Sequence, residues 1–331
     1  MKPGPHNAIT DVPGVLVGQV ERVDAPYLTG TTVVHVPATA VAGVDVRGGA
    51  PGTRETDLLD PVNSNSGVNA VVLTGGSGYG LDTAGSVMRW LENRGEGVRV
   101  GLGDNEVVPI VPAAVIFDLG RGGGFQARPE PSWGADAIAA ADDGPVALGN
   151  HGAGAGARAR SLKGGVGSAS VRLDDGTTVG ALVIVNAAGS TVDGDGNLYG
   201  ARYGIGDEFT HLRTPTEPPP PAAPGRNLIP GPPMNTVIAV VATDVPLDKA
   251  AGRVVATSVV PYPPGIPMVM PGENLGPANG AWIGYLRALR DWDARFPGFG
   301  HETHGVEVRA GEHYLQCVKP ETAAQTRAKP R

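Results

Sequence analysis

The segment Met234–Asp244 reads MNTVIAVVATD and follows a long proline-rich segment that ends at Pro233. An uninterrupted apolar run begins directly after the hydroxyl residue Thr236. If the chain were cut before Thr236, its hydroxyl and its new α-amine would form a nucleophile and a base on one residue. The alternative is a linker followed by a buried strand that starts near Thr236. These residues alone favour the alternative, because short motifs are weak evidence.

The length and composition indicate a globular chain rich in short strands. With 331 residues it is long enough for one large or two ordinary domains. Hydrophobic residues make up 41% and aromatic residues 5%, so the core must consist mostly of Val, Ala, Leu and Ile. The 51 glycines and 31 prolines accompany an alternation of apolar and polar residues. This combination predicts many short strands and tight turns rather than disorder.

Charge and hydropathy exclude several classes of partner. The net charge is −7 and no basic run is present, which argues against nucleic acid as the main partner. No window approaches 18 consecutive apolar residues, so we expect no membrane partner. The first ten residues lack the apolar core of a signal peptide. The single cysteine, Cys317, cannot form an internal disulfide, so we expect a cytoplasmic protein.

Alternation and helical periodicity predict the main elements. The predicted strands cover 31–37, 41–46, 70–73, 168–173 and 177–186, and a turn at 174–176 joins the last two as a hairpin. One predicted helix ends at Gly95 and carries on one face Leu81, Ala84, Val87, Met88 and Leu91. A second predicted helix covers 133–141, and a short amphipathic one lies at 281–292.

A glycine-rich turn, Gly75–Gly80, connects strand 70–73 to the first helix. Strand, turn and helix together resemble a dinucleotide-binding fingerprint. However, Leu81 occupies the place of the third glycine of G-x-G-x-x-G, and no acidic residue closes a following strand at the right distance. Nucleotide binding is therefore a minor alternative for this turn.

Six separated blocks, taken in order, resemble one family. They are Ile9–Val15, Val46–Asp57, Leu73–Leu81, Val108–Asp118, Lys163–Ser170 and Asn235–Asp244. From Ile9 to about Lys249 the sequence resembles the DmpA-type aminopeptidases, a family that includes β-aminopeptidases and nylon-oligomer hydrolases. The resemblance implies an α/β fold, the αββα four-layer sandwich of the DmpA/ornithine-acetyltransferase type. It also implies a self-processing N-terminal-nucleophile hydrolase, without cofactor or metal, that acts on a small peptide or amide substrate and forms a homo-oligomer.

Site residues follow from the same resemblance by position. The chain would cut itself between Asn235 and Thr236, and the freed Thr236 would attack an amide carbonyl. Asn186 would offer its side-chain amide to the oxyanion, and Lys163 would position or polarise groups near the nucleophile. Phe117 is a substrate-pocket candidate, at a position where some members have a tyrosine. The alternative for Lys163 is a solvated loop lysine.

The resemblance stops after Lys249. The family should continue with a helix and an acidic Asp-Gly-Asp-Thr-like segment that orients the nucleophile, and neither follows here. The earlier Asp193–Asn197, DGDGN, lies before the cut and is typical of a hairpin turn. We therefore expect a peptidase-like domain over 1–250, with its proline-rich processing segment at 214–233. We expect the sandwich to be incomplete at its C-terminal end, with an unpaired edge or an uncovered apolar face.

The remaining residues, 251–331, form a second predicted domain, a small α+β tail. Its blocks Gly252–Pro267, Met270–Glu273 and Phe296–Gly305 resemble the C-terminal part of the Orn/Lys/Arg decarboxylases over 252–319. The Ser-x-His-Lys segment that binds pyridoxal phosphate in those enzymes is absent, so we infer neither cofactor nor decarboxylation. His301–His304, HETH, is one residue short of the zinc pattern H-E-x-x-H, so we expect a loop without metal.

Several hypotheses about function stay open at this point. The first is a self-processing aminopeptidase or amidohydrolase that uses Thr236. The second is an unprocessed, inactive homologue, because the orienting carboxylates are missing. The third is a binding or assembly module whose tail makes an oligomer contact. A fragment related to a pyridoxal-phosphate-dependent amino-acid decarboxylase is a further alternative.

Overall fold

The computed structural model describes residues 1–59, 67–215 and 234–245, together with strands in 260–262, 302–304, 306–309 and 312–315. The chain forms two compact units, Met1–Val245 and Pro246–Arg331. Most of the processing segment, 216–233, and the predicted helix 281–292 lie outside the described residues.

In the second unit, β13 (Val260–Tyr262) pairs antiparallel with β14 (Glu302–His304), and β15 (Val306–Arg309) pairs antiparallel with β16 (Glu312–Leu315). The loop predicted at His301–His304 is therefore wrong for its last three residues, which belong to β14.

The first unit contains a five-stranded mixed sheet in the order β1-β2-β4-β7-β3. The strands are β1 (Leu16–Arg22), β2 (Thr29–Ala40), β3 (Thr53–Arg54), β4 (Val68–Thr74) and β7 (Ala113–Val115). β4 and β7 are parallel, and the other neighbours are antiparallel. β4 is buried on both faces, because Val, Ala and Leu fill nearly every position and its two neighbours satisfy its backbone.

A second sheet of three antiparallel strands has the order β10-β11-β12. Its strands are β10 (Gly165–Arg172), β11 (Thr178–Val185) and β12 (Ile238–Thr243). β10 and β11 form the predicted hairpin, in which Gly176 takes the left-handed backbone conformation that the turn requires. Buried and half-buried residues alternate along β11, as expected for a strand with one face on a core.

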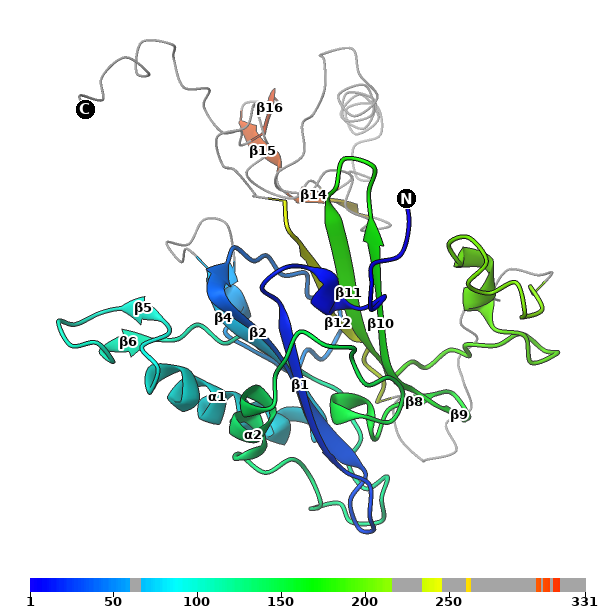
Figure 1. Ribbon diagram of the computed structural model, residues 1–331, viewed down its shortest axis with the longest axis horizontal. Coiled ribbons are helices and arrows are strands. Elements are labelled where there is room, and N and C mark those ends of the chain that lie inside the picture. Colours follow the sequence, from blue (N-terminus) through cyan, green and yellow to red (C-terminus); the bar gives the residue numbers. More distant parts are fainter. Residues whose placement is uncertain are drawn as a thin grey trace. The chain divides into compact units, whose positions relative to one another are not determined.

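Two apolar cores define three layers in the described part of the first unit (Figure 1). One core lies between the two sheets and includes Val17, Val34, Leu73, Val166, Leu182 and Ile184. The other lies between the five-stranded sheet and helices α1 (Thr83–Glu92) and α2 (Trp133–Ala139), both of which confirm predicted helices. The layers are thus helix, sheet, sheet, and a fourth layer stays a prediction.

The shorter elements connect these layers. Short strand pairs are β5 (Val98–Arg99) with β6 (Val107–Val108), and β8 (Arg158–Ala159) with β9 (Leu162–Lys163). In the described residues, 3-10 helices span Ile9–Asp11, Thr56–Leu59, Ser77–Asp82, Gly152–Gly154 and Tyr199–Tyr203. The turn predicted at Asp193–Asn197 is confirmed, because the Asp193 carboxylate accepts hydrogen bonds from the backbone N–H groups of Asp195 and Asn197.

The strand predicted over Val41–Val46 is wrong. Strand β2 continues to Ala40, and the chain then runs without regular structure to Gly49. Val41, Val44 and Val46 are exposed, and no described strand pairs with them. Apolar alternation fits a strand only where a partner strand satisfies the backbone.

The outer face of the three-stranded sheet is apolar and open in the described part of the molecule. β12 lies at an edge of this sheet, and its residues alternate between half-buried and exposed. Val241 is 69% exposed although it lies within the strand. The incomplete sandwich, with an uncovered apolar face and an unpaired edge, stays a prediction.

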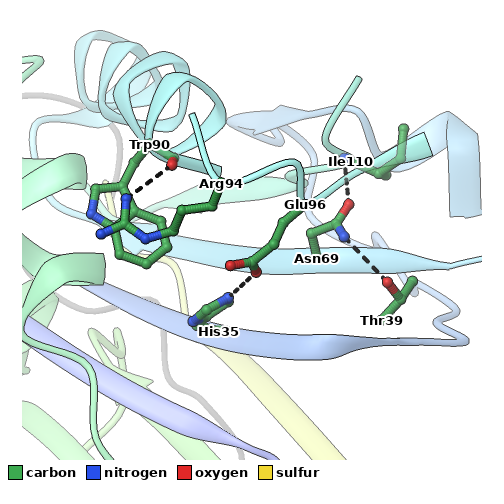
Figure 2. A network of polar contacts seen from close by, with 7 residues as sticks. All are labelled: His35, Thr39, Asn69, Trp90, Arg94, Glu96 and Ile110. Atoms are coloured by element: carbon green, nitrogen blue, oxygen red, sulfur yellow. Dashed lines mark hydrogen bonds and ion pairs between the residues drawn. The ribbon is translucent and has the colours of Figure 1, made fainter. Parts of the chain in front are cut away.

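A polar network ties the helix α1 and the segment after it to the five-stranded sheet (Figure 2). His35, buried on β2, shares a hydrogen bond of 2.8 Å between its Nε2 and Oε2 of Glu96. The imidazole meets the ring of Trp90 edge to face at 5.6 Å, and the Arg94 guanidinium stacks over that ring at 3.4 Å. This network lies among structural elements and brings none of the predicted site residues together.

Asn69 forms the other half of the network in Figure 2. Its Oδ1 accepts a hydrogen bond from the backbone N–H of Ile110 at 3.0 Å, and its Nδ2 donates to Oγ1 of Thr39 at 3.2 Å. Asn69 is only 3% exposed, so water cannot replace either partner. The side chain therefore holds the start of β4 to the end of β2 and to the segment before β7.

We expect Asn69→Ala to lower the free energy of unfolding by about 1–3 kcal/mol, because it leaves the buried N–H of Ile110 without an acceptor. Urea unfolding followed by circular dichroism measures the loss. Asn93→Ala, at an exposed asparagine after α1, is the matched control and should change it by less than about 0.5 kcal/mol. Equal effects of the two changes would contradict the structural role of Asn69.

Candidate functional site

A buried carboxylate lies where three strand ends of the five-stranded sheet meet. Asp118 follows β7 by three residues and is 3% exposed. Its Oδ2 accepts a hydrogen bond of 2.7 Å from the hydroxyl of Thr29, the first residue of β2. Its Oδ1 accepts one of 2.6 Å from the backbone N–H of Gly76, just after β4. Asp118 thus fastens the beginning of one strand to the end of another.

Glycines make room for this carboxylate. A Cβ on Gly75 would lie 2.1 Å from Oδ2 of Asp118, and one on Gly156 would lie 2.7 Å from the same atom. Neither position can carry a side chain without moving the carboxylate. Glycines at these two positions therefore let two backbone segments close over Asp118.

The same contact bears on the glycine-rich turn at Gly75–Gly80. A dinucleotide site needs the backbone N–H groups of such a turn to face a phosphate. Here the N–H of Gly76 binds the carboxylate of Asp118 instead. This donor is already taken by an anion of the protein itself, which disfavours nucleotide binding at this turn.

Arg121 connects Asp118 to the second sheet. Its Nη1 donates two hydrogen bonds of 2.6 Å, one to the backbone oxygen of Gly156 and one to Oδ1 of Asn186. Its backbone N–H donates to the carbonyl of Asp118 at 3.2 Å, so the two charged residues share one turn. The result is a continuous polar chain from Thr29 on the first sheet to Asn186 on the second.

Burial and charge act in opposite directions on this pair. Burial raises the pKa of Asp118, while the hydrogen bonds from Thr29 and Gly76 and the charge of Arg121 limit the rise. Burial likewise lowers the pKa of Arg121, and the charge of Asp118 opposes that change. Removing either charge would leave the other buried with less compensation.

Asn186, predicted as the oxyanion donor, follows β11 by one residue and has no exposed surface. Thr236, the predicted nucleophile, is half-buried and precedes β12 by two residues. β11 and β12 are antiparallel with Ile184 opposite Ile238, so Asn186 and Thr236 lie at the same end of the strand pair. The same register, continued by two residues on each strand, would bring Asn186 opposite Thr236.

Lys163 lies on β9 and is exposed. Its strand partner is Arg158, whose backbone N–H donates to Oδ1 of Asn186 at 3.2 Å. The β8–β9 pair therefore borders the same end of β11 that carries Asn186. The side chain of Lys163 itself is solvated there, as its alternative interpretation requires.

Phe117 is half-buried between Ile116 and Asp118. Its backbone oxygen lies 3.5 Å from Nδ2 of Asn186, a long hydrogen bond. Its ring carries no hydroxyl, so it can shape an apolar pocket wall but cannot donate to an oxyanion. Asn235, which precedes Thr236 across the predicted cleavage point, is half-buried.

Sequence reasoning missed Asp118, Arg121 and Thr29. Asp118 stood at the end of one of the six blocks, and Arg121 stands in the glycine-rich loop that follows. A buried apolar stretch that ends in a carboxylate was the available signal, because a charge at that place needs partners. Arg121 offered no such signal, since an arginine in a glycine-rich loop is usually solvated.

Metal and membrane sites receive no support from the described part of the chain. It holds no group of three or more His, Cys, Asp or Glu side chains that could bind a metal ion. None of its helices is both long and apolar enough to span a bilayer.

Comparisons with known proteins identify the family of this chain. The model of Peptidase family S58 matches residues 7–260. The chain belongs to peptidase family S58. An uncharacterized aminopeptidase of Mycobacterium leprae is 49% identical over 265 residues, which cover 76% of this chain and 71% of that protein. The expected enzyme class, a peptidase or aminopeptidase, is confirmed at the level of the family.

A solved structure extends the comparison. A β-aminopeptidase of Burkholderia sp. is 27% identical with a TM-score of 0.48, and the match covers 74% of this S58 chain and 64% of the other. The chain thus spans less than two thirds of that protein's length.

The tail resemblance is confirmed as well. The model of the Orn/Lys/Arg decarboxylase C-terminal domain matches residues 224–319. The biodegradative arginine decarboxylase of Escherichia coli is 51% identical over 75 residues, which are 23% of this chain and 10% of that enzyme. The two family matches overlap between residues 224 and 260.

Asp118→Asn should change how stability depends on pH. Because the pKa of Asp118 is raised on folding, the folded state holds this proton better than the unfolded state. Its contribution to stability is therefore fully present below about pH 4, the usual range of an aspartate, and is lost as the pH rises through the folded-state pKa. We expect the difference in urea midpoint between the wild type and Asp118→Asn to decrease as the pH rises from about 4 through the folded-state pKa of Asp118.

Asp104→Asn, at an exposed carboxylate, is the control and should show no such trend. If the midpoint of the wild type relative to Asp118→Asn rises with pH, Arg121 and the two hydrogen bonds affect the pKa of Asp118 more than burial does.

Proposed function

We propose that this S58 chain is a self-processing peptidase that cuts itself between Asn235 and Thr236 and then uses Thr236 as an N-terminal nucleophile. In the uncut chain the hydroxyl of Thr236 attacks the carbonyl of Asn235, and the peptide C–N bond breaks to free the α-amine of Thr236. Water then hydrolyses the ester that links Asn235 to the Thr236 oxygen, which completes the cut. After the cut, the new α-amine serves as the base for attack on a substrate amide, and water releases the acyl group. One observation carries the proposal: Thr236 and the buried amide of Asn186 share one end of the β11–β12 pair.

The oxyanion is the charge that this site must stabilise. Asn186 has its oxygen occupied by Arg121 and by the N–H of Arg158, while its Nδ2 makes one long contact, to Phe117, among the described residues. An amide N–H with spare capacity in a buried site is a strong donor for developing negative charge. Such a donor contributes about 10²–10³-fold to the rate in other acyl-transfer enzymes.

The proposed substrate is a small peptide or amide with a free amino terminus. The family is named for peptidases, and the relatives named above are an aminopeptidase and a β-aminopeptidase. The four-layer sandwich, the domain boundary near residue 250, the cytoplasmic location and the homo-oligomer stay predictions.

A second candidate, an uncleaved and inactive homologue, is favoured by one observation. Among residues 236–245 the single acidic residue is Asp244, and its Oδ1 accepts a hydrogen bond of 2.9 Å from the N–H of Thr178. Asp244 lies beyond the far end of β12 from Thr236, so it cannot orient the nucleophile. The orienting carboxylates that the family resemblance implies are therefore missing from this stretch.

Intact-mass spectrometry of purified protein separates the two candidates. We expect two fragments whose masses correspond to a break between Asn235 and Thr236. Thr236→Ala should abolish the break and Thr236→Ser should retain it, because the serine hydroxyl can also attack. Thr243→Ala, the same chemical change at an exposed position of β12, should leave cleavage unchanged. Full-length mass alone after prolonged incubation would favour the inactive homologue.

Lys163→Met should slow cleavage by about 10²-fold if its ammonium group polarises groups near the nucleophile. The urea midpoint should stay unchanged, since Lys163 is exposed. Lys163→Arg, which keeps the charge, should recover part of the rate. Cleavage of Lys163→Met at the wild-type rate would assign Lys163 to its alternative role as a solvated loop residue.

A further inference from the structure

The amide of Asn186 has one orientation that its neighbours allow. Arg121 Nη1 and the backbone N–H of Arg158 both approach the same end of the amide, at 2.6 and 3.2 Å. Both groups can only donate, so the end that faces them must be the oxygen. The nitrogen end is thereby turned away from Arg121, and its contact in the described residues is the long one to the oxygen of Phe117.

Arg121 is itself held in place before any substrate binds. The two hydrogens of its Nη1 are divided between Gly156 and Asn186. Gly156 packs closely against the backbone, since a Cβ there would lie 2.3 Å from the backbone oxygen of Leu28. The charge of Asp118, in the same turn, further favours the guanidinium at this place.

We propose that Arg121 is a positioning residue, which binds Oδ1 of Asn186 and so leaves the N–H₂ end of that amide as the donor for the oxyanion. The inference rests on the proposed function, in which Asn186 stabilises the negative charge formed at an attacked carbonyl. Rotation of the amide by half a turn would present its oxygen to the oxyanion and repel it. Among the described residues, the backbone N–H of Arg158 is the donor to Oδ1 that remains without Arg121 and opposes this rotation.

The first arm of the test measures the contact between Arg121 and residue 186 through the urea midpoint and requires no activity. Asn186→Asp replaces the amide by a carboxylate that can accept from the same two donors. We expect this variant to keep a urea midpoint near that of the wild type at pH 7. Combining it with Arg121→Met should lower the midpoint by more than the sum of the two single changes, because a buried carboxylate then loses its counter-charge.

The loss of urea midpoint in the double variant, beyond the sum of the two single changes, should fade as the pH falls towards about 4. At that pH the introduced carboxyl becomes protonated. Additive midpoints at every pH would overturn the contact between Arg121 and residue 186.

The second arm measures catalysis, through the rate of self-cleavage and through hydrolysis of L-alanine p-nitroanilide. Arg121→Met should lower kcat by about tenfold or more with KM within about twofold, because the oxyanion forms only during reaction. Arg121→Lys should recover part of kcat. Arg160→Met, at an exposed arginine in the neighbouring β8–β9 turn, is the matched control and should keep the wild-type rate.

A double-mutant cycle distinguishes positioning from general support of the fold. In an Asn186→Ala background, Arg121→Met should cause no further loss of rate, since the donor that it orients is gone. Losses that multiply would overturn the proposal. A wild type that neither cleaves itself nor hydrolyses the anilide would remove the proposed function, and the first arm would still decide by itself whether Arg121 orients residue 186.

Discussion

The hydrogen-bond ladder between β11 and β12 is the constraint on which the site depends. It joins residues on both sides of the segment 186–237 into one sheet. Ile238, Val240 and Ala242 pack against the core between the sheets, while the residues between them face outward. A slip by one residue would turn these three side chains out of the core and would also move Thr236 away from the level of Asn186. Burial of Ile238, Val240 and Ala242 therefore determines which residue before β12 lies at the level of the residue that follows β11.

The second constraint is electrostatic. The strand ends at this edge leave backbone donors and hydroxyls in a region without water, and a carboxylate can bind several of them at once. Asp118 binds Thr29 and Gly76, and its charge in turn favours the guanidinium of Arg121 nearby. The guanidinium then reaches Asn186 on the other sheet. The side-chain amide of Asn186, the proposed oxyanion donor, is thus held by residues whose own role is to satisfy buried polar atoms.

The sequence predicted the elements that show a clear hydrophobic periodicity. It failed where the structure depends on contacts with residues that are distant in sequence. The hairpin of β10 and β11 and the helices α1 and α2 followed from alternation, helical spacing and turn residues. Val41–Val46 alternates as well, but its described surroundings provide no strand to pair with it. Asp118 escaped notice because its partners Thr29 and Gly76 lie 89 and 42 residues away in sequence, and Arg121 lies 65 residues from Asn186. Thr236 stood out by its place after the proline-rich segment, but its expected role and those of Asn186 and Lys163 came from the family resemblance.

The proposed self-cleavage and the proposed turnover would place different demands on these residues. Before the cut, the nitrogen of Thr236 belongs to a peptide bond and cannot act as a base, so another group must accept the proton of its hydroxyl. The oxyanion formed at the carbonyl of Asn235 in the proposed cut would need the same donor as a substrate, and Asn186 is fully buried. The proposed cut would separate residue 235 from Thr236 and so free the residue that precedes the proposed nucleophile to move. An arrangement fixed by Arg121 and by the β11–β12 register would survive that change, because neither contact involves the residues before Thr236.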